Sequence, residues 1–402
     1  MPTESTFLLA GLFLLLAAAG WALGRFGDRE EPEGAPPPLN VDYLKGLNFL
    51  LNEQTDQALE HFLNMVRVDD KTIETHFALG SLFRRRGEVD RAIRIHQNII
   101  ARPDLGSDQR DQALYSLAQD YLKAGLLDRA ENMLQRLAAG SRFQVEALEQ
   151  LCRIYEQEKE WQKAIEASQK LETLSGRSLA LQVAHYYCEL ADKAAESGDY
   201  GAARTFVKKS QAGRPRTMRG ALTRAAIARA TGDTKTAIRL YKRVVDDNSH
   251  LMPEALPALI EIYDDEGSLD RLNRDLEGLI KKNPKVSNQI AYSAVVNNMG
   301  GLPVIDTCVE NYIVNEPTLA EFIDVQQLST ESEEERHAAL EKVRAGLNKL
   351  AGMTPRYQCK ECGFSSQRLL WQCPSCKDWE TQRPFASVQF DSLLQRNGII
   401  DY

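Results

Sequence analysis

The chain has 402 residues, more than one ordinary hydrophobic core accommodates, so repeats or several domains are expected. Its composition, with 43% hydrophobic and 26% charged residues, is typical of a folded soluble body. The formal net charge of −8 gives no general electrostatic reason to bind nucleic acid and excludes the strongly basic classes of nucleic-acid-binding protein.

The first predicted element is an uncharged apolar segment, STFLLAGLFLLLAAAGWALG, from Ser5 to Gly24. At about 1.5 Å per residue it forms a helix of about 30 Å, the thickness of the hydrocarbon core of a bilayer. We therefore expect a transmembrane helix over residues 5–25. A cleaved signal peptide is the alternative, because AAAG can be read as a cleavage site, although no basic residue precedes the segment.

The charges beside this segment predict its orientation. Arg25 and Arg29 lie on its C-terminal side and no basic residue lies on the other, so the positive-inside rule places the body on the cytoplasmic side of a single-pass protein. Cysteines scattered singly, at Cys152, Cys188 and Cys308, agree with a reducing compartment because they form no disulfide framework. Residues 26–40, rich in proline, glycine and charge, read as a linker.

From residue 41 to 317 the sequence repeats one pattern of small and aromatic residues. The first unit has Gly46, Phe49 and Ala58, and the second has Gly80, Phe83 and Ala92, which lie 34 residues later. Seven units share this register, and an eighth, degenerate unit is expected before residue 317. The pattern resembles the tetratricopeptide repeat, a helix–turn–helix unit. It predicts an all-α solenoid of seven to eight units.

The repeated residue types have a physical reading. Small residues let two antiparallel helices approach closely, and bulky residues fill the space to the next pair. Glycines fall at the turn between helices, where a helix C-cap favours positive φ: Gly87, Gly125, Gly198, Gly232 and Gly267. Capping helices are expected over 318–352, the second with Ser332 as N-cap, because the last repeat of a solenoid leaves an apolar face open.

Four of the seven cysteines lie in CKECGFSSQRLLWQCPSC, within a predicted domain at 355–385 that a tail at 386–402 follows. They form two C-x₂-C pairs: Cys359 with Cys362, and Cys373 with Cys376. Each pair predicts a tight turn with two thiolates aimed at one point, so together they predict tetrahedral ligation of one metal ion. Two redox dithiols or paired disulfides are the alternative, which a cytosolic setting disfavours.

Zinc and iron both suit four thiolates. The C-x₂-C-G and C-P-x-C halves are similar to those of rubredoxin, which holds iron, but the short separation is similar to that of a zinc ribbon, so zinc is favoured over iron. Four protein ligands leave no open position, which predicts a structural site. A small ribbon has too little core to bury four large apolar side chains by itself: Leu369, Leu370, Trp371 and Trp379. We therefore expect the ribbon to dock on the solenoid.

Signatures of catalysis are missing from the sequence: it contains no Gly-rich phosphate loop, no H-E-x-x-H and no G-x-S-x-G. His96 and Cys152 occupy packing positions of their repeats. The candidate binding residues are Arg84 and Arg85, which end a first helix near the expected groove and suit a carboxylate of a partner. Solvated charge beside a turn is the other reading. A second basic stretch suits an acidic partner surface or membrane phosphate, with solvated charge again as the alternative: Arg214, Arg216, Arg219, Arg224 and Arg229.

The whole chain resembles the lipopolysaccharide assembly protein B family of Gram-negative bacteria. The stretches that carry the resemblance are GWALGR, GLNFLLNEQTDQALEHFL, LGSLFRRRGEVDRAIRIHQ, EWQKAI, AHYYCELA and RYQCKECGF with LLWQCPSC. The resemblance implies a protein of the bacterial inner membrane that acts as an adaptor and is not an enzyme. It further implies that the protein restrains lipopolysaccharide synthesis by promoting proteolysis of the lipid A-committing deacetylase.

The resemblance also implies three partners: a membrane AAA+ protease, that deacetylase, and a membrane regulator that senses lipopolysaccharide. One competing hypothesis is a rubredoxin-type electron-transfer protein carried on a repeat scaffold. A ribbon that binds nucleic acid is disfavoured, because its local charge is mixed: Lys360, Arg368 and Lys377 against Glu361, Asp378 and Glu380.

Overall fold

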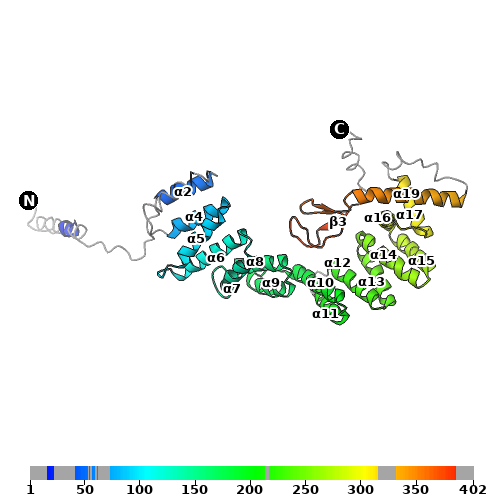
Figure 1. Ribbon diagram of the computed structural model, residues 1–402, viewed down its shortest axis with the longest axis horizontal. Helices are drawn as coiled ribbons and strands as arrows, with labels where there is room; N and C mark the ends of the chain where they lie inside the picture. Colours follow the sequence, from blue (N-terminus) through cyan, green and yellow to red (C-terminus); the bar gives the residue numbers. More distant parts are fainter. Residues whose placement is uncertain are drawn as a thin grey trace, which may run out of the picture. The chain divides into compact units, whose positions relative to one another are not determined.

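The computed structural model describes residues 16–21, 41–52, 54, 57–58, 61, 73–212, 217–315 and 332–385. The described chain is mostly helical and divides into two compact units, Met1–Ala130 and Glu131–Tyr402 (Figure 1). Of the predicted transmembrane segment only residues 16–21 are described, and they are helical; across the described residues, no helix is long and apolar enough to cross a membrane. The predicted linker at 26–40 and the first capping helix lie outside the described residues.

The described part of the first unit contains helices at the periodicity that the repeats predict. They are α2 (Val41–Leu51), α4 (Ile73–Arg85), α5 (Val89–Ile100), α6 (Ser107–Lys123) and the start of α7 (Leu127–Ala138). Their small repeat residues are packed tightly: Ala92 and Ala118 are fully buried. A Cβ atom at Gly80 would lie 2.6 Å from the ring of His96, so only glycine fits between α4 and α5. The close helix approach predicted from the sequence is confirmed here.

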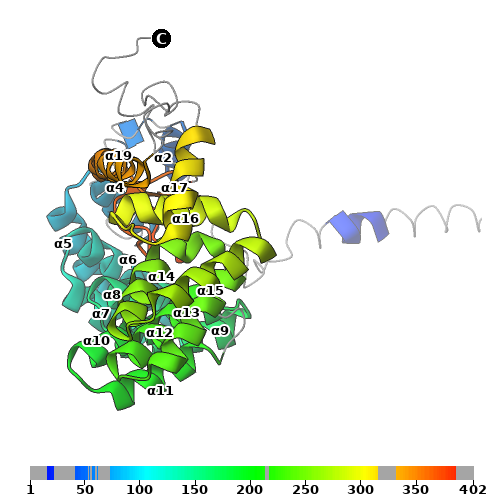
Figure 2. The same cartoon turned by 90° about the vertical axis from the view of Figure 1, so that its right-hand side faces the viewer.

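The second unit is built of antiparallel helix pairs. These are α8 (Gln144–Gln157) with α9 (Trp161–Ser175), α10 (Ala180–Glu196) with α11 (Tyr200–Ser210), α12 (Met218–Ala230) with α13 (Thr234–Asp247), α14 (Met252–Asp265) with α15 (Leu269–Lys282), and α16 (Val286–Asn297) with α17 (Pro303–Asn315). A short 3-10 helix, η1 (Ser249–Leu251), precedes α14. Figure 2 shows α11 at one end of this stack and α16 and α17 at the other, with α12 to α15 between them.

The end of this array is covered by α19 (Glu333–Met353), which packs against α16 and α17. The predicted N-cap is confirmed, because the side chain of Ser332 accepts a hydrogen bond from the backbone N–H of Glu335. Leu340, Leu347 and Ala351 of α19 are buried in one continuous apolar cluster with α12 to α17. The open apolar face of the last repeats is therefore covered, as a solenoid requires.

The predicted turn glycines have the expected backbone conformation. Gly87, Gly125, Gly198, Gly232 and Gly267 have φ between 61° and 82°. In the α8–α9 turn the corresponding residue is Lys159, with φ 58°. A side chain is disfavoured in this conformation, so the turn geometry is imposed by the packing of the two helices and not by local preference.

Candidate metal centre and its docking surface

The ribbon is a three-stranded antiparallel sheet in the order β2-β1-β3. Its strands are β1 (Tyr357–Cys359), β2 (Ser365–Ser366) and β3 (Gln382–Pro384). The two cysteine turns have the same hydrogen bonds. Gly363 donates its N–H to the carbonyl of Cys359 at 2.9 Å, and Lys377 donates to the carbonyl of Cys373, also at 2.9 Å. Gly363 has φ 76° and Lys377 has φ 65°, so each turn is closed by a left-handed residue.

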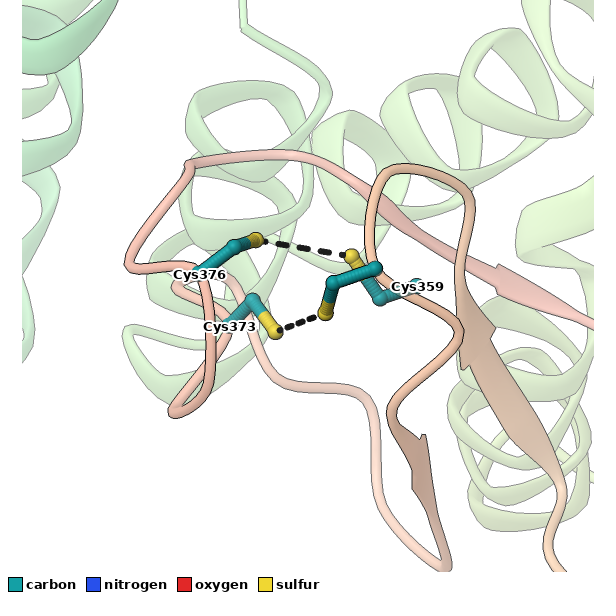
Figure 3. Close-up of side chains that lie close together, drawn as sticks. Cys359, Cys373 and Cys376 are labelled. Atoms are coloured by element: carbon teal, nitrogen blue, oxygen red, sulfur yellow. Dashed lines mark hydrogen bonds between the residues drawn. The ribbon is translucent and has the colours of Figure 1, made fainter. Parts of the chain in front are cut away.

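These turns bring the four cysteine sulfurs together, within 4.8 Å of one another. Sγ of Cys359 lies 3.7 Å from that of Cys376, and Sγ of Cys362 lies 3.6 Å from that of Cys373. Figure 3 shows the sulfurs of Cys359, Cys373 and Cys376 pointing into one space. Both distances far exceed a disulfide bond of about 2.05 Å. They match the edge of a tetrahedron of about 3.8 Å that sulfurs form around zinc at about 2.3 Å.

The chemistry of this donor set fits a metal ion. Burial opposes ionisation of the Cys359 thiol, but the Thr381 hydroxyl at 3.3 Å and the backbone amides of Cys362 and Glu361 lower its pKa to about 6. The backbone amide of Asp378 favours the Cys376 thiolate, yet burial and the three other thiols raise the pKa of Cys376 to about 12. Four thiolates at these distances need a cation to be stable together, and zinc and iron both meet that requirement.

The ribbon docks on the helices of its own unit, as the apolar residues predicted, and Trp379 is the centre of the contact. Its ring stacks on His185 of α10, with centroids 4.7 Å apart, and meets Trp161 of α9 edge-on at 6.4 Å. Its indole N–H donates to the carboxylate of Glu156 on α8 at 3.3 Å. Trp379 is 7% exposed, so the docking removes most of a large apolar side chain from water.

Polar contacts fix the position of the docked ribbon. The carboxylate of Glu380 accepts the backbone N–H of Met218 at 2.7 Å, at the N-terminus of α12, where unpaired amides favour a negative charge. Gln372 donates its amide to Glu156 at 3.2 Å. The hydroxyl of Tyr357 donates to Glu254 of α14. The hydroxyl of Tyr292 on α16 donates to the backbone carbonyl of Arg356 at 3.4 Å. The ribbon therefore contacts the first helices of successive pairs, from α8 to α16.

Arg219 is the main revision to the second basic stretch predicted from the sequence. It is 5% exposed and donates to Glu189 and Asp192 of α10, each at 2.6 Å, while its guanidinium lies 6.0 Å from the centre of the Trp371 ring. Arg229 pairs with Glu261 at 2.8 Å. Arg214 and Arg216 lie outside the described residues, and Arg224 is exposed. The acidic partners of Arg219 are thus within the chain.

The two candidate groove arginines, both in the first unit, have different surroundings. Arg84 donates to Asp120 at 2.7 Å and to the backbone carbonyl of Ser116 at 3.2 Å. The other carboxylate oxygen of Asp120 contacts Nδ1 of His96, and both side chains are fully buried. The guanidinium of Arg84 is therefore held between α4 and α6. His96 is confirmed as a core residue.

Arg85 is exposed and lines a hollow of about 280 Å³. Phe77 and Leu82 form part of its floor, and Glu74 and Gln109 form part of its rim. The hollow has both an apolar floor and polar groups, which is what a protein segment needs for specific binding. Contact of Arg84 and Arg85 with a partner remains a prediction.

Sequence reasoning missed the helical half of the docking surface: Glu156, Trp161, His185 and Arg219. His185 is fully buried, and neither ring nitrogen has a hydrogen-bond partner in the described residues. Burial, with the charge of Arg219 as a second cause, lowers the pKa of His185 to about 3. The available signal was a cluster of aromatic residues, HYY, in a first helix. The rings of His185 and Tyr186 contact Trp379 of the ribbon, whereas Tyr187 contacts Lys209 of α11.

Comparisons with known proteins agree with both parts of this architecture. A family model described as a rubredoxin metal binding domain matches residues 357–384, and tetratricopeptide-repeat models match 75–107 and 115–177. The chain is 34% identical over 386 residues to Lipopolysaccharide assembly protein B of Escherichia coli K12, covering 95% of this chain and 99% of that one. It is 31% identical over 395 residues to the protein of that name from Haemophilus influenzae, covering 94% and 98%.

Among solved structures, the C-terminal part of a tetratricopeptide-repeat protein from Cytophaga hutchinsonii is 15% identical. That match covers 70% of this chain and 98% of the other, with a TM-score of 0.37.

Proposed function

Since the chain belongs to the lipopolysaccharide assembly protein B family, we propose that it is an adaptor that regulates lipopolysaccharide biosynthesis and catalyses no reaction itself. The observation that supports an adaptor best is the arrangement of the ribbon. All four cysteine sulfurs converge on one point, which leaves a bound metal no open position for a substrate. The ribbon is packed on the helices through Trp379 and Glu380, so its metal would hold a surface in place.

The adaptor is proposed to be anchored in the bacterial inner membrane by residues 5–25, with its body on the cytoplasmic side. The support is the uncharged apolar sequence of this segment and the arginines that follow it. Tethering suits an adaptor because confinement beside a membrane partner raises the effective concentration, so weak contacts suffice. The prediction is that the chain without residues 1–25 folds but no longer regulates at native abundance. Normal regulation by that shortened chain would contradict tethering.

The proposed mechanism is the promotion of proteolysis. The chain would bring the lipid A-committing deacetylase to a membrane AAA+ protease, and a membrane regulator that senses lipopolysaccharide would relieve this action. The hollow beside Arg85 is the surface proposed for one of these proteins, because it offers an exposed cation above an apolar floor.

Affinity capture of the full chain from membranes tests this mechanism. Wild type should retain both the protease and the deacetylase. Arg85→Glu should lose one of them, while Arg94→Glu, an exposed position on α5 that does not line the hollow, should retain both. Capture of neither protein by the wild type, in membranes that contain both, would contradict the proposed mechanism.

A second candidate function is electron transfer by a rubredoxin-type iron centre. The exposure of Cys362 favours it, because one sulfur of the cluster faces solvent where an electron carrier could approach. Metal analysis with a visible absorption spectrum separates the two functions. A colourless zinc protein supports the structural site, and a red iron protein with a reversible one-electron reduction supports electron transfer.

A further inference from the structure

A groove on the second unit, lined by residues outside the metal ribbon, has the size of a ligand site. It lies along α11, α12 and α13 and encloses about 670 Å³, within the range of about 300–1,000 Å³ that small-molecule pockets occupy. The hollow at Arg85 encloses only about 280 Å³. The groove that these three helices line is called the α11–α13 groove.

Each helix contributes one stripe of side chains to this groove. Arg204, Val207, Lys208 and Gln211 come from α11 and its C-cap, Arg224, Ile227 and Ala228 from α12, and Asp233, Thr236 and Leu240 from α13 and its N-cap. The spacings of three and four residues place each stripe on one helix face. Arg204 and Gln211 lie seven positions apart, so the groove is about 10 Å long along α11. Its floor is aliphatic and its rim is charged.

The groove continues into a second hollow of about 190 Å³, which shares Gln211, Arg224 and Leu240 with it. The second hollow adds two apolar residues, Val244 and Leu251, and the ion pair of Arg243 with Asp247, further along α13 and η1. Arg224 therefore stands at the junction of the two hollows, with aliphatic side chains on both sides. An occupant that follows the groove needs an anionic part near Arg224 and an apolar part that extends from it.

The rim of the groove is positively charged, although the chain as a whole is negatively charged. Three cations, Arg204, Lys208 and Arg224, surround the groove with one carboxylate, Asp233, on a chain whose net charge is −8. Asp233 accepts the backbone N–H of Thr236 at 3.2 Å. Within the described residues, Lys208 and Arg224 form no salt bridge. Their charges are thus available to an anion, and two net positive charges match a phosphate monoester of −1.5 to −2 better than a single carboxylate.

The remaining polar groups make a peptide a poorer occupant. A peptide backbone presents one donor and one acceptor per residue and needs partners for them. In the groove the amide of Gln211 donates to the carbonyl of Thr217 at 3.2 Å, and the guanidinium of Arg204 donates to the hydroxyl of Thr231 at 2.8 Å. An aliphatic chain needs no such partners. We propose that the α11–α13 groove binds a phosphate lipid, with its phosphate on Lys208 and Arg224 and its aliphatic chain along the floor.

Photolabelling tests this site and is independent of the regulatory function. The full chain is labelled with decyl phosphate that carries a diazirine at the end of its chain, and the labelled peptides are mapped by mass spectrometry. Labels are expected on peptides from α11 to η1, and excess unlabelled decyl phosphate should remove them. Lys208→Glu and Arg224→Glu should each lower labelling about tenfold, the effect of losing one charge-assisted hydrogen bond.

Controls separate the proposed lipid from other occupants. Arg239→Glu reverses an exposed charge on α13 that does not line the groove and should label like wild type. A matched decanol probe should label at least about tenfold less, and a matched decanoate probe should fall between the two. Thermal unfolding checks that each variant is folded. Equal labelling by decanol, labels spread over other helices, no effect of the two charge reversals, or stronger displacement by an acidic peptide than by decyl phosphate would each overturn the proposal.

Discussion

His185 and Trp379 stack with ring centroids 4.7 Å apart and ring planes 20° from parallel. The contact joins α10 to the turn that carries Cys376, although the two residues are far apart in the chain. Trp379 lies only three residues from Cys376, a predicted metal ligand. The position of the metal and the packing of the helices are therefore coupled.

Removal of the Trp379 side chain is expected to weaken docking without destroying the cysteine cluster. Trp379→Ala should lower the free energy of unfolding of the second unit by about 3 kcal/mol, the usual cost of truncating a buried tryptophan. Urea unfolding followed by circular dichroism measures this change. Phe364→Ala is the control, because Phe364 belongs to the same ribbon but is exposed, and it should change the stability by less than about 0.5 kcal/mol. Equal effects of the two substitutions would contradict the docking account.

Docking should weaken in mild acid because of His185. Burial holds its pKa at about 3 in the folded protein, while an unfolded histidine has a pKa of about 6.5. Below pH 6.5 the unfolded chain therefore binds a proton that the folded chain does not, and the free energy of unfolding should fall by about 1.4 kcal/mol per pH unit. Burial raises the pKa of Glu380, whose carboxylate lies 3.8 Å from His185, and this acts in the opposite direction nearer about pH 4.3.

Urea unfolding of wild type and His185→Phe between about pH 7.5 and 5.5 isolates this contribution. The variant keeps an aromatic ring against Trp379 but binds no proton, so its slope with pH should be smaller than that of wild type. Metal content is measured in parallel, because protons also compete with metal for thiolates. Identical slopes would show that His185 does not remain neutral in the docked state.

Introducing a glycine into one cysteine turn should stabilise the ribbon, and replacing the glycine of the other turn should destabilise it. Lys377 has φ 65°, a conformation that costs a residue with a side chain about 1–2 kcal/mol. Lys377→Gly should therefore stabilise the metal-loaded ribbon by about 0.5–1 kcal/mol after the entropy of glycine is counted. Gly363→Ala, at φ 76°, should destabilise it by about 1 kcal/mol. Thermal unfolding of the loaded protein measures both, and a gain from Gly363→Ala would contradict the turn geometry.

In the first unit, we expect Asp120 to be essential for stability and Arg85 to contribute little to it. Asp120 contacts Arg84 and His96 while fully buried, so Asp120→Ala leaves charge without a partner and should cost about 3–5 kcal/mol. Arg85→Ala changes an exposed side chain and should cost less than about 0.5 kcal/mol. Urea unfolding of the two variants makes the comparison. A large loss from Arg85→Ala would assign it a structural role and weaken its assignment to partner binding.

The sequence predicts the structural features that depend on residues close together in the chain. Helix pairs, the glycine at position 80 and the left-handed turn glycines follow from periodicity, and the convergence of Cys359, Cys362, Cys373 and Cys376 follows from two matched pairs. Each of these features is set by residues a few positions apart or by one repeating unit, so no long-range arrangement had to be known.

The sequence could not predict which helices the ribbon contacts. The sequence marks Trp379 as apolar area that the ribbon cannot bury alone, but its partners belong to repeats far earlier in the chain: Glu156, Trp161 and His185. Local sequence groups Arg219 with exposed basic residues, because the acidic side chains that pair with it lie on α10, a full repeat earlier. The orientation of the ribbon and the pairing of buried charges depend on tertiary contacts that local patterns do not encode.

Hydrogen exchange after metal removal tests most directly whether the metal centre is a structural part of the binding scaffold. The full chain is loaded with zinc, treated with a chelator, and the backbone amide exchange of both forms is mapped. If the account is right, exchange rises at Met218 and Arg219, whose N–H groups face Glu380, and in α8 and α10 as well as in the ribbon. Faster exchange confined to residues 357–384, with α8 to α12 unchanged, would contradict it.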